Sequence, residues 1–438
     1  MTGIEIGIVS IAAILGLIWL GVHVAVALGM VSFVGVWLMR GNIDVALQLL
    51  SLAARDSIAN YIFGVIPLFV LMGLVINASN VGRDAYLVAQ YAFRRLRGGL
   101  GVATVAANAL FAAMTGISIA SAAVFTRISV PEMLRYGYAP RFAVGVVAGS
   151  SVLGMLIPPS ILLVVYALVV QESVADMFLA GIVPGLLLTL AYVVAIMLAT
   201  RWRPDWVVPG GAPAAEAGGP DLSLAEIAGK LAPALALILL VLGGIYGGLF
   251  TPTEAGAVGA LGAIVISVLQ GRMTWRSFWD VLMETGQITA AILFLVISAT
   301  MYSRMLGLAG MPTQIGNWIG AAEFSFVTVM LVYILVLLVL GMVMDAVSII
   351  LITVPLFLPA FAPFDINLIW FGIITVIAVE IGLLTPPLGI SCYVIKSSLN
   401  DPRITLWDVF AGAAPFALVM LMVLGLVILF PALSLILI

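Results

Sequence analysis

Residues 382–389 read GLLTPPLG and interrupt an apolar run that extends from 366 to 396. Pro386 and Pro387 have no backbone N–H, and their rings clash with the preceding turn, so a helix cannot continue through them. The glycines at both ends of the stretch allow dihedral angles that other residues avoid. Unpaired backbone at membrane depth is stable only where it is buried in protein or lines a polar cavity. We therefore interpret this stretch as the break of a discontinuous helix at an internal site.

A second break of the same kind occurs earlier in the chain. Residues 154–160 read GMLIPPS and place Pro158 and Pro159 inside the apolar run 142–170. Three pairs of landmarks have similar separations: Pro158 and Pro386 (228 residues), Pro131 and Pro355 (224), and Phe69 and Phe294 (225). The near-constant separation indicates a duplication. Two broken helices at equivalent places in two halves point to the binding site of a transporter.

The composition excludes a soluble protein. Hydrophobic residues make up 64% of the 438 residues and charged residues 8%, whereas a soluble domain has about 25% charged residues. The net charge of −3 provides no basic surface for a nucleic acid. Cys392 and His23 are the only cysteine and histidine, which excludes disulfides and Cys/His metal clusters. A membrane enzyme would need clustered acids, a nucleophile with its base, or metal ligands, so an enzyme is not expected.

The pattern of apolar runs predicts an all-α polytopic membrane protein in two halves, residues 1–200 and 231–438, joined by a cytoplasmic linker at 201–230. We expect spanning helices at 4–20, 22–39, 61–77, 142–170, 176–200, 231–248, 255–270, 286–303, 366–396 and 409–436. Mixed arms are expected at 40–60 and 271–285, and amphipathic segments at 78–98 and 304–325.

Two further segments, 99–131 and 326–362, are expected to form re-entrant helical hairpins. Each contains two apolar arms of about 15 residues, shorter than the roughly 20 residues that a spanning helix needs. Their centres read MTGIS at 114–118 and GMVMD at 341–345. Hairpins and broken helices at matching positions predict one structural repeat present twice.

The distribution of basic residues predicts that the two halves are inverted. With the basic segment 78–98 in the cytoplasm, fourteen of the 17 lysines and arginines face the cytoplasm. The other three, Arg40, Arg55 and Arg304, face outside. This split agrees with the positive-inside rule. The first hairpin then enters from the cytoplasm and the second from outside, as in secondary transporters with inverted repeats.

Four motifs carry a resemblance to a known family. They read LIPPS at 156–160, YGGLFTPTEA at 246–255, GMVMDA at 341–346 and EIGLLTPPLG at 380–389. Together they resemble the large membrane subunit (M subunit) of a tripartite ATP-independent periplasmic (TRAP) transporter. The resemblance implies an elevator-type transporter of the bacterial inner membrane. It also implies sodium-coupled uptake of a small organic acid, such as a C4-dicarboxylate, keto acid or sugar acid.

The resemblance further implies two protein partners. One is a small membrane subunit on a separate chain, and the other is a periplasmic substrate-binding protein that delivers the acid. Membrane lipid surrounds the spanning helices. The alternative is a stand-alone sodium:anion symporter of a related inverted-repeat fold, which would work without a binding protein.

Candidate ligands for Na⁺ lie at the hairpin centres and the helix breaks. Sodium binds oxygen atoms, which unwound backbone carbonyls and the C-termini of half-helices supply. The first candidate sodium site comprises Thr115, Gly116, Ser118, Pro158, Pro159 and Ser160. The second comprises Gly341, Met344, Asp345, Thr385, Pro386 and Pro387. The candidate substrate-binding residues are Thr115, Gly116, Ser118, Ser160, Thr385 and Pro386. The alternative is that small residues and prolines serve only close helix packing.

Three acidic residues lie within or beside apolar runs. A carboxylate inside a membrane is costly and is by default functional or paired. For Asp345, capping of the returning hairpin arm and ion coordination are both open. For Glu380 we favour a structural hydrogen bond. Glu254 follows Thr251-Pro252-Thr253, which is typical of a helix start.

The predicted topology can be tested by labelling single introduced cysteines in one fixed state of the protein. Ile117→Cys and Val343→Cys, at the hairpin centres beside Gly116 and Gly341, should react from opposite sides of the membrane, and cysteines within 201–226 should react from the cytoplasm. Reaction of the two hairpin positions from the same side would contradict the inverted arrangement.

Overall fold

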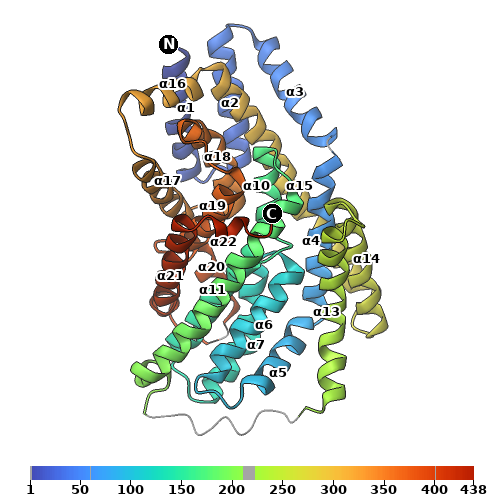
Figure 1. Ribbon diagram of the computed structural model, residues 1–438. Helices are drawn as coiled ribbons and strands as arrows, with labels where there is room; N and C mark the ends of the chain where they lie inside the picture. Colours follow the sequence, from blue (N-terminus) through green and yellow to red (C-terminus); the bar gives the residue numbers. More distant parts are fainter. Residues whose placement is uncertain (1, 60, 211–221, 400) are drawn as a thin grey trace.

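A computed structural model describes residues 2–59, 61–210, 222–399 and 401–438 (Figure 1). Residues 211–221 of the expected linker therefore lie outside the described residues. The helices up to the linker are α1 (Gly3–Trp19), α2 (Val24–Arg40), α3 (Ile43–Ala59), η1 (Tyr61–Gly64), α4 (Val65–Ala78), α5 (Val81–Phe93), α6 (Gly99–Thr115), α7 (Ser118–Arg135), α8 (Pro140–Ser151), α9 (Leu153–Leu156), α10 (Ile161–Val170), α11 (Val174–Trp202) and α12 (Pro204–Val207).

The helices after the linker follow a similar order. They are α13 (Leu224–Tyr246), α14 (Pro252–Leu269), α15 (Trp275–Leu308), α16 (Met311–Ala321), α17 (Phe326–Gly341), α18 (Ala346–Phe361), η2 (Ala362–Phe364), α19 (Leu368–Leu383), α20 (Ile390–Ser398), α21 (Leu406–Leu429) and α22 (Ala432–Leu435). The predicted all-α polytopic class is confirmed. Among the described residues, seven helices are long and apolar enough to cross a membrane, or eight with the bent pair α8–α9 and α10.

Two boundaries differ from the sequence prediction. The arm expected at 271–285 and the span expected at 286–303 form one 34-residue helix, α15. The sequence of α15 contains no proline, so nothing interrupts the helix. In the first half, Gly64 and Pro67 lie between α3 and the body of α4, and two separate helices form. Helix α13 begins at Leu224 rather than 231, because Ser223 and Glu226 form a capping box.

Helix α19 forms the centre of the molecule (Figure 1). Every residue from Ile369 to Leu383 is buried, so its hydrophobic surface extends all round the helix, as expected for a core helix. Helices α17, α21, α10 and α11 pack around it. The broken helices of both halves are therefore held in one core.

Glycines allow the closest helix contact, the crossing of α8 with α21. A Cβ atom added to Gly145 would lie 2.1 Å from the carbonyl oxygen of Gly412. No side chain fits between the two backbones. In contrast, a Cβ atom on Gly425, also in α21, would meet nothing within 4 Å.

We expect Gly145→Ala to destabilise the protein and Gly425→Ala to leave its stability unchanged or slightly higher. Overpacking a tight contact costs about 1–3 kcal/mol, whereas alanine is the better helix former by about 0.5–1 kcal/mol. Thermal unfolding of the purified proteins in detergent measures the difference. Equal midpoints for the two variants would contradict the contact.

Candidate functional site

The tip of the first hairpin lies directly on the first helix break. Gly116 ends α6 with a φ of +65°, and its carbonyl oxygen accepts a hydrogen bond from the backbone N–H of Ile161 at 3.3 Å. A Cβ atom on Gly116 would lie 2.4 Å from the carbonyl oxygen of Pro159. Glycine is therefore required here both by the left-handed backbone and by the close approach.

Ser160 connects the two parts of the first broken helix. Its hydroxyl donates to the carbonyl of Met155 at 2.5 Å and accepts from the N–H of Leu163 at 3.3 Å. It is thus the N-cap of α10. Pro158, Pro159 and Ser160 are buried, so this break lies inside the protein.

The second hairpin meets the second break in a similar way. A Cβ atom on Gly341 would lie 2.7 Å from the Cα atom of Gly382. The carbonyl of Met342 accepts hydrogen bonds from the N–H groups of Leu388 (3.2 Å) and Gly389 (3.3 Å). The prolyl bonds Pro158-Pro159 and Pro386-Pro387 are both cis.

The two breaks differ in exposure. Pro386, Pro387 and Leu388 are exposed, whereas the prolines of the first break are buried. Thr385 is partly buried, and its hydroxyl donates to the carbonyl of Ile381 at 2.8 Å. The second break is therefore accessible from outside the protein.

The threonine hydroxyls keep their oxygen atoms available for a ligand. Thr115 donates its proton to the carbonyl of Phe111 at 2.9 Å, four residues earlier, as Thr385 does to Ile381. A hydroxyl that donates its proton in this way retains oxygen lone pairs. These lone pairs are suitable for a hard cation such as Na⁺.

Asp345 caps the returning arm of the second hairpin. Its Oδ1 atom accepts from the N–H of Ser348 at 3.0 Å, and its Oδ2 atom accepts from the Ser348 hydroxyl. The capping alternative is confirmed, whereas ion coordination by Asp345 stays a prediction. Met344 is buried beside it.

Glu380 connects the second half of the chain to the first hairpin. The hydroxyl of Ser118, the first residue of α7, donates to Glu380 Oε1 at 3.4 Å. Both residues are buried, with 1% exposure for Glu380. The expected structural hydrogen bond of Glu380 is confirmed. No local feature of the sequence indicates that its partner is Ser118, itself a candidate sodium ligand.

Glu254 also has its expected role. Its carboxylate accepts from the N–H of Thr251 at 2.8 Å, and the hydroxyl of Thr251 accepts from the N–H of Glu254 at 3.3 Å. This capping box starts α14.

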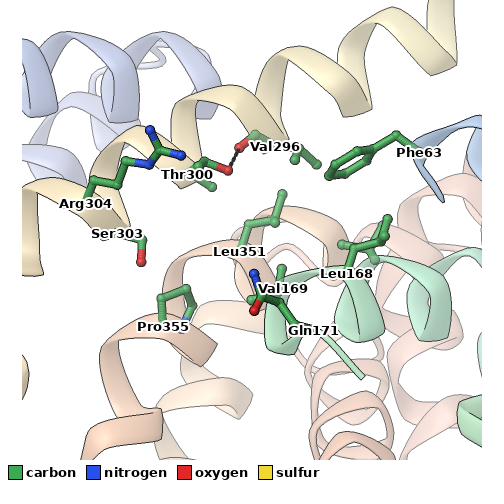
Figure 2. Close-up of a pocket in the computed structure, with 12 residues that line it drawn as sticks. Phe63, Leu168, Val169, Gln171, Val296, Thr300, Ser303, Arg304, Leu351 and Pro355 are labelled. Atoms are coloured by element: carbon green, nitrogen blue, oxygen red, sulfur yellow. Dashed lines mark hydrogen bonds between the residues drawn. The ribbon is translucent and has the colours of Figure 1, made fainter. Parts of the chain in front are cut away.

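The structure also contains a polar cavity that the sequence analysis did not identify (Figure 2). It lies between α15 on one side and α10 and α18 on the other. Thr300, Ser303 and Arg304 line it from α15. Their spacing of three and four residues places them on one face of α15, and this periodicity can be recognised in the sequence.

The helical fold, with each hairpin tip seated on a broken helix, is that of a membrane transport protein. The chain belongs to the family of the DctM component of tripartite ATP-independent periplasmic transporters, whose model matches residues 11–433. It is therefore a TRAP-transporter large permease subunit, a multi-pass protein of the bacterial inner membrane.

Individual proteins show the same relationship. The chain is 35% identical over 390 residues to the C4-dicarboxylate TRAP transporter large permease protein DctM of Pseudomonas aeruginosa, with 88% of each chain covered. It is 29% identical to the sialic acid TRAP transporter large permease protein SiaM of Vibrio cholerae, covering 98% of this chain and 97% of that one. The crystal structure of the Alcanivorax borkumensis YdaH transporter has a similar fold, with a TM-score of 0.59 and 15% identity over 88% of this chain and 89% of that one.

The contact between Gly116 and Pro159 predicts a specific effect of a methyl group at the hairpin tip. Gly116→Ala should push the tip away from the break and abolish uptake, because its Cβ atom would overlap the Pro159 carbonyl. Gly137→Ala is the matched control, since Gly137 also has a positive φ (+82°) but would meet nothing within 4 Å. Both variants have the left-handed backbone cost of about 1–2 kcal/mol. Similar uptake by the two variants would show that the tip contact is dispensable.

Proposed function

We propose that this permease couples the inward movement of Na⁺ to the import of a small organic acid delivered by a periplasmic binding protein. Relatives are named for C4-dicarboxylates and for sialic acid, which have a carboxylate in common. An organic anion must remain solvated by the protein as it crosses, because a carboxylate in hydrocarbon is very costly.

The observation that carries this proposal is the seating of each hairpin tip on a helix break. At each contact between a hairpin tip and a helix break, a helix N-terminus lies next to backbone carbonyl groups. Helix α10 begins after Ser160, and α20 begins after Gly389. Helix N-termini favour a carboxylate through N–H groups that have no helical partner. At α10, two of these groups already donate hydrogen bonds, that of Ile161 to Gly116 and that of Leu163 to Ser160. The carbonyl groups beside them favour a cation. The two seats therefore suit an organic anion and Na⁺ together, and bound Na⁺ would strengthen binding of the anion.

In this proposal, the first ion is held by Thr115, Gly116, Ser118 and the backbone of 158–160. The second is held by Gly341, Met344, Asp345 and the backbone of 385–387. The exposed second break offers a route by which solutes reach the site, because Pro386 and Pro387 are not covered by other parts of the described chain.

The moving part of the proposed elevator consists of the two hairpins and the two broken helices. The Ser118–Glu380 hydrogen bond supports movement as one body, because it joins the first hairpin to the second broken helix. Helices α1, α2, α13, α14 and α15 would stay fixed. Exposed leucines on α13 and α14, among them Leu239 and Leu261, provide an apolar surface for lipid and for the small membrane subunit.

Uptake into proteoliposomes tests the function directly. The permease, reconstituted with its small subunit, should take up an acid from a panel of C4-dicarboxylates, keto acids and sugar acids. Uptake should require a Na⁺ gradient and the cognate binding protein, and it should not require ATP. Equal uptake with K⁺ in place of Na⁺ would refute sodium coupling. Uptake without the binding protein would favour a stand-alone symporter.

Substitutions at the second break test the ion site. Thr385→Ala removes one proposed oxygen ligand and should lower the apparent affinity for Na⁺ by roughly tenfold, which corresponds to about 1.4 kcal/mol. Thr189→Ala is the matched control, because Thr189 makes the same type of hydrogen bond, to Gly185 at 2.8 Å, in α11. Asp345→Asn retains an N-cap and should also weaken Na⁺ dependence. Unchanged Na⁺ affinity in both Thr385→Ala and Asp345→Asn would move the ion site elsewhere.

A further inference from the structure

The cavity beside α15 has two parts that share lining residues, and Figure 2 shows the smaller one. The smaller part has a volume of about 270 Å³ and the larger about 510 Å³. They share Phe63, Leu168, Gln171, Thr300 and Arg304. Small-molecule sites typically have volumes of about 300–1,000 Å³, so a small organic acid fits.

We propose that this cavity is an entry chamber in which Arg304 binds a carboxylate of the organic acid before the acid reaches the hairpin tips. The inference rests on the proposed function, since it assigns a first binding step to the same substrate class. Neither Arg304 nor the cavity belongs to the site formed by the tips and breaks.

Charge distinguishes the smaller part of the chamber. Arg304 is the only charged residue among those that line it. Thr300 and Ser303 lie beside Arg304 on the same face of α15, and the amide of Gln171 lies across from them (Figure 2). A guanidinium group binds a carboxylate through two parallel hydrogen bonds, and hydroxyl and amide groups complete a polar site. This set of side chains favours an anion.

Arg304 can exchange its present partner for a substrate. It forms an ion pair with Asp56 of α3, whose side chain is 58% exposed, while that of Arg304 is 32% exposed. Exposed ion pairs contribute little net free energy. Asp56 lines only the larger part of the chamber, as does Glu172. A carboxylate entering the smaller part therefore replaces Asp56 at little cost.

Two helices extend from the chamber wall to the hairpin tips and breaks. Helix α18 contributes Leu351 and Pro355 and begins just after Asp345. Leu351 lies six residues beyond Asp345, which is about 9 Å along the helix axis. Gln171 ends α10, the helix that starts at Ser160 of the first break. Both proposed moving helices thus connect the chamber wall to the candidate substrate site.

The proposed chamber can be tested without a transport assay by comparing how fast anionic and cationic reagents label a cysteine placed in it. Ser303→Cys is placed in a Cys392→Ser background, because Cys392 is the only cysteine. The purified protein, in detergent without Na⁺, is labelled with the anionic sulfonatoethyl and the cationic trimethylammonioethyl methanethiosulfonates. The ratio of anionic to cationic rates should be higher for Ser303→Cys than for Asn42→Cys, an exposed position outside the cavity.

Charge substitutions then identify the residue responsible. Adding Arg304→Gln should lower the rate ratio for Ser303→Cys by roughly tenfold, the effect of removing one nearby unit charge. Asp56→Asn should raise the ratio. Arg55→Gln is the matched control: Arg55 is exposed, belongs to the same helix as Asp56 and does not line the cavity, so the ratio should not change. An unchanged ratio in Arg304→Gln would overturn the proposal.

Protection by a carboxylate distinguishes specific binding at Arg304 from a general effect of its positive charge. Succinate should slow labelling of Ser303→Cys, and glycerol should not. Arg304→Lys should keep the rate ratio but lose most of the protection by succinate, because lysine cannot form the paired hydrogen bonds. In proteoliposomes, Arg304→Lys should raise the KM for the transported acid more than it lowers kcat. If sodium-driven uptake is unchanged in Arg304→Gln, the chamber is refuted and the proposed function is not. If uptake by the unmodified protein does not depend on Na⁺, the proposed function is refuted.

Discussion

The structure depends on the need to satisfy backbone hydrogen bonds where two helices break inside the membrane. Each break leaves N–H and C=O groups without helical partners, and unpaired groups in hydrocarbon are unstable. The hairpin tips supply partners. The carbonyl of Gly116 accepts from Ile161, and that of Met342 accepts from Leu388 and Gly389. Glycines at the points of contact remove the side chains that would otherwise keep hairpin and break apart.

Seating a hairpin on a break also produces the chemistry of the site. A helix that is interrupted has two extra ends, one with free donors and one with free acceptors. The tips pair part of these groups, such as the N–H of Ile161, and the first break is buried whereas Pro386 and Pro387 of the second are exposed. The Ser118–Glu380 hydrogen bond then joins the first hairpin to α19, the first part of the second broken helix.

Much of this arrangement could be predicted from the sequence, because it depends on local chemistry. Paired prolines stop a helix wherever they occur, so the breaks were expected at the right places. The helix pairs α6–α7 and α17–α18 lie where the hairpins were expected. Because α18 and η2 together (Ala346–Phe364) are long and apolar enough to cross a membrane, the re-entrant character of the hairpins stays a prediction. Helix α13 begins seven residues before the apolar run that predicts it, because the Ser223–Glu226 capping box starts the helix. The continuity of α15 was also missed, since its polar N-terminal part resembles a separate arm.

The partner of Glu380 and the cavity beside Arg304 could not be predicted in the same way. Ser118 and Glu380 are 262 residues apart, and the cavity combines side chains from η1, α10, α15 and α18. Such sites depend on how distant helices pack together, which one sequence does not specify. Only the contribution of α15, with polar residues at 300, 303 and 304, has a local periodicity that indicates a shared face.

The unbroken length of α15 makes bilayer thickness relevant to this protein. A helix of 34 residues is about 51 Å long, which exceeds the roughly 30 Å of a hydrocarbon core. Trp275 and Trp279, both exposed near its first turn, are suited to the headgroup region and would fix the depth of that end. The tilt of this unbroken helix then determines how much of its length lies in the hydrocarbon core. Since Arg304 lies near the opposite end, lipids with longer or shorter acyl chains would change its depth relative to the membrane surface.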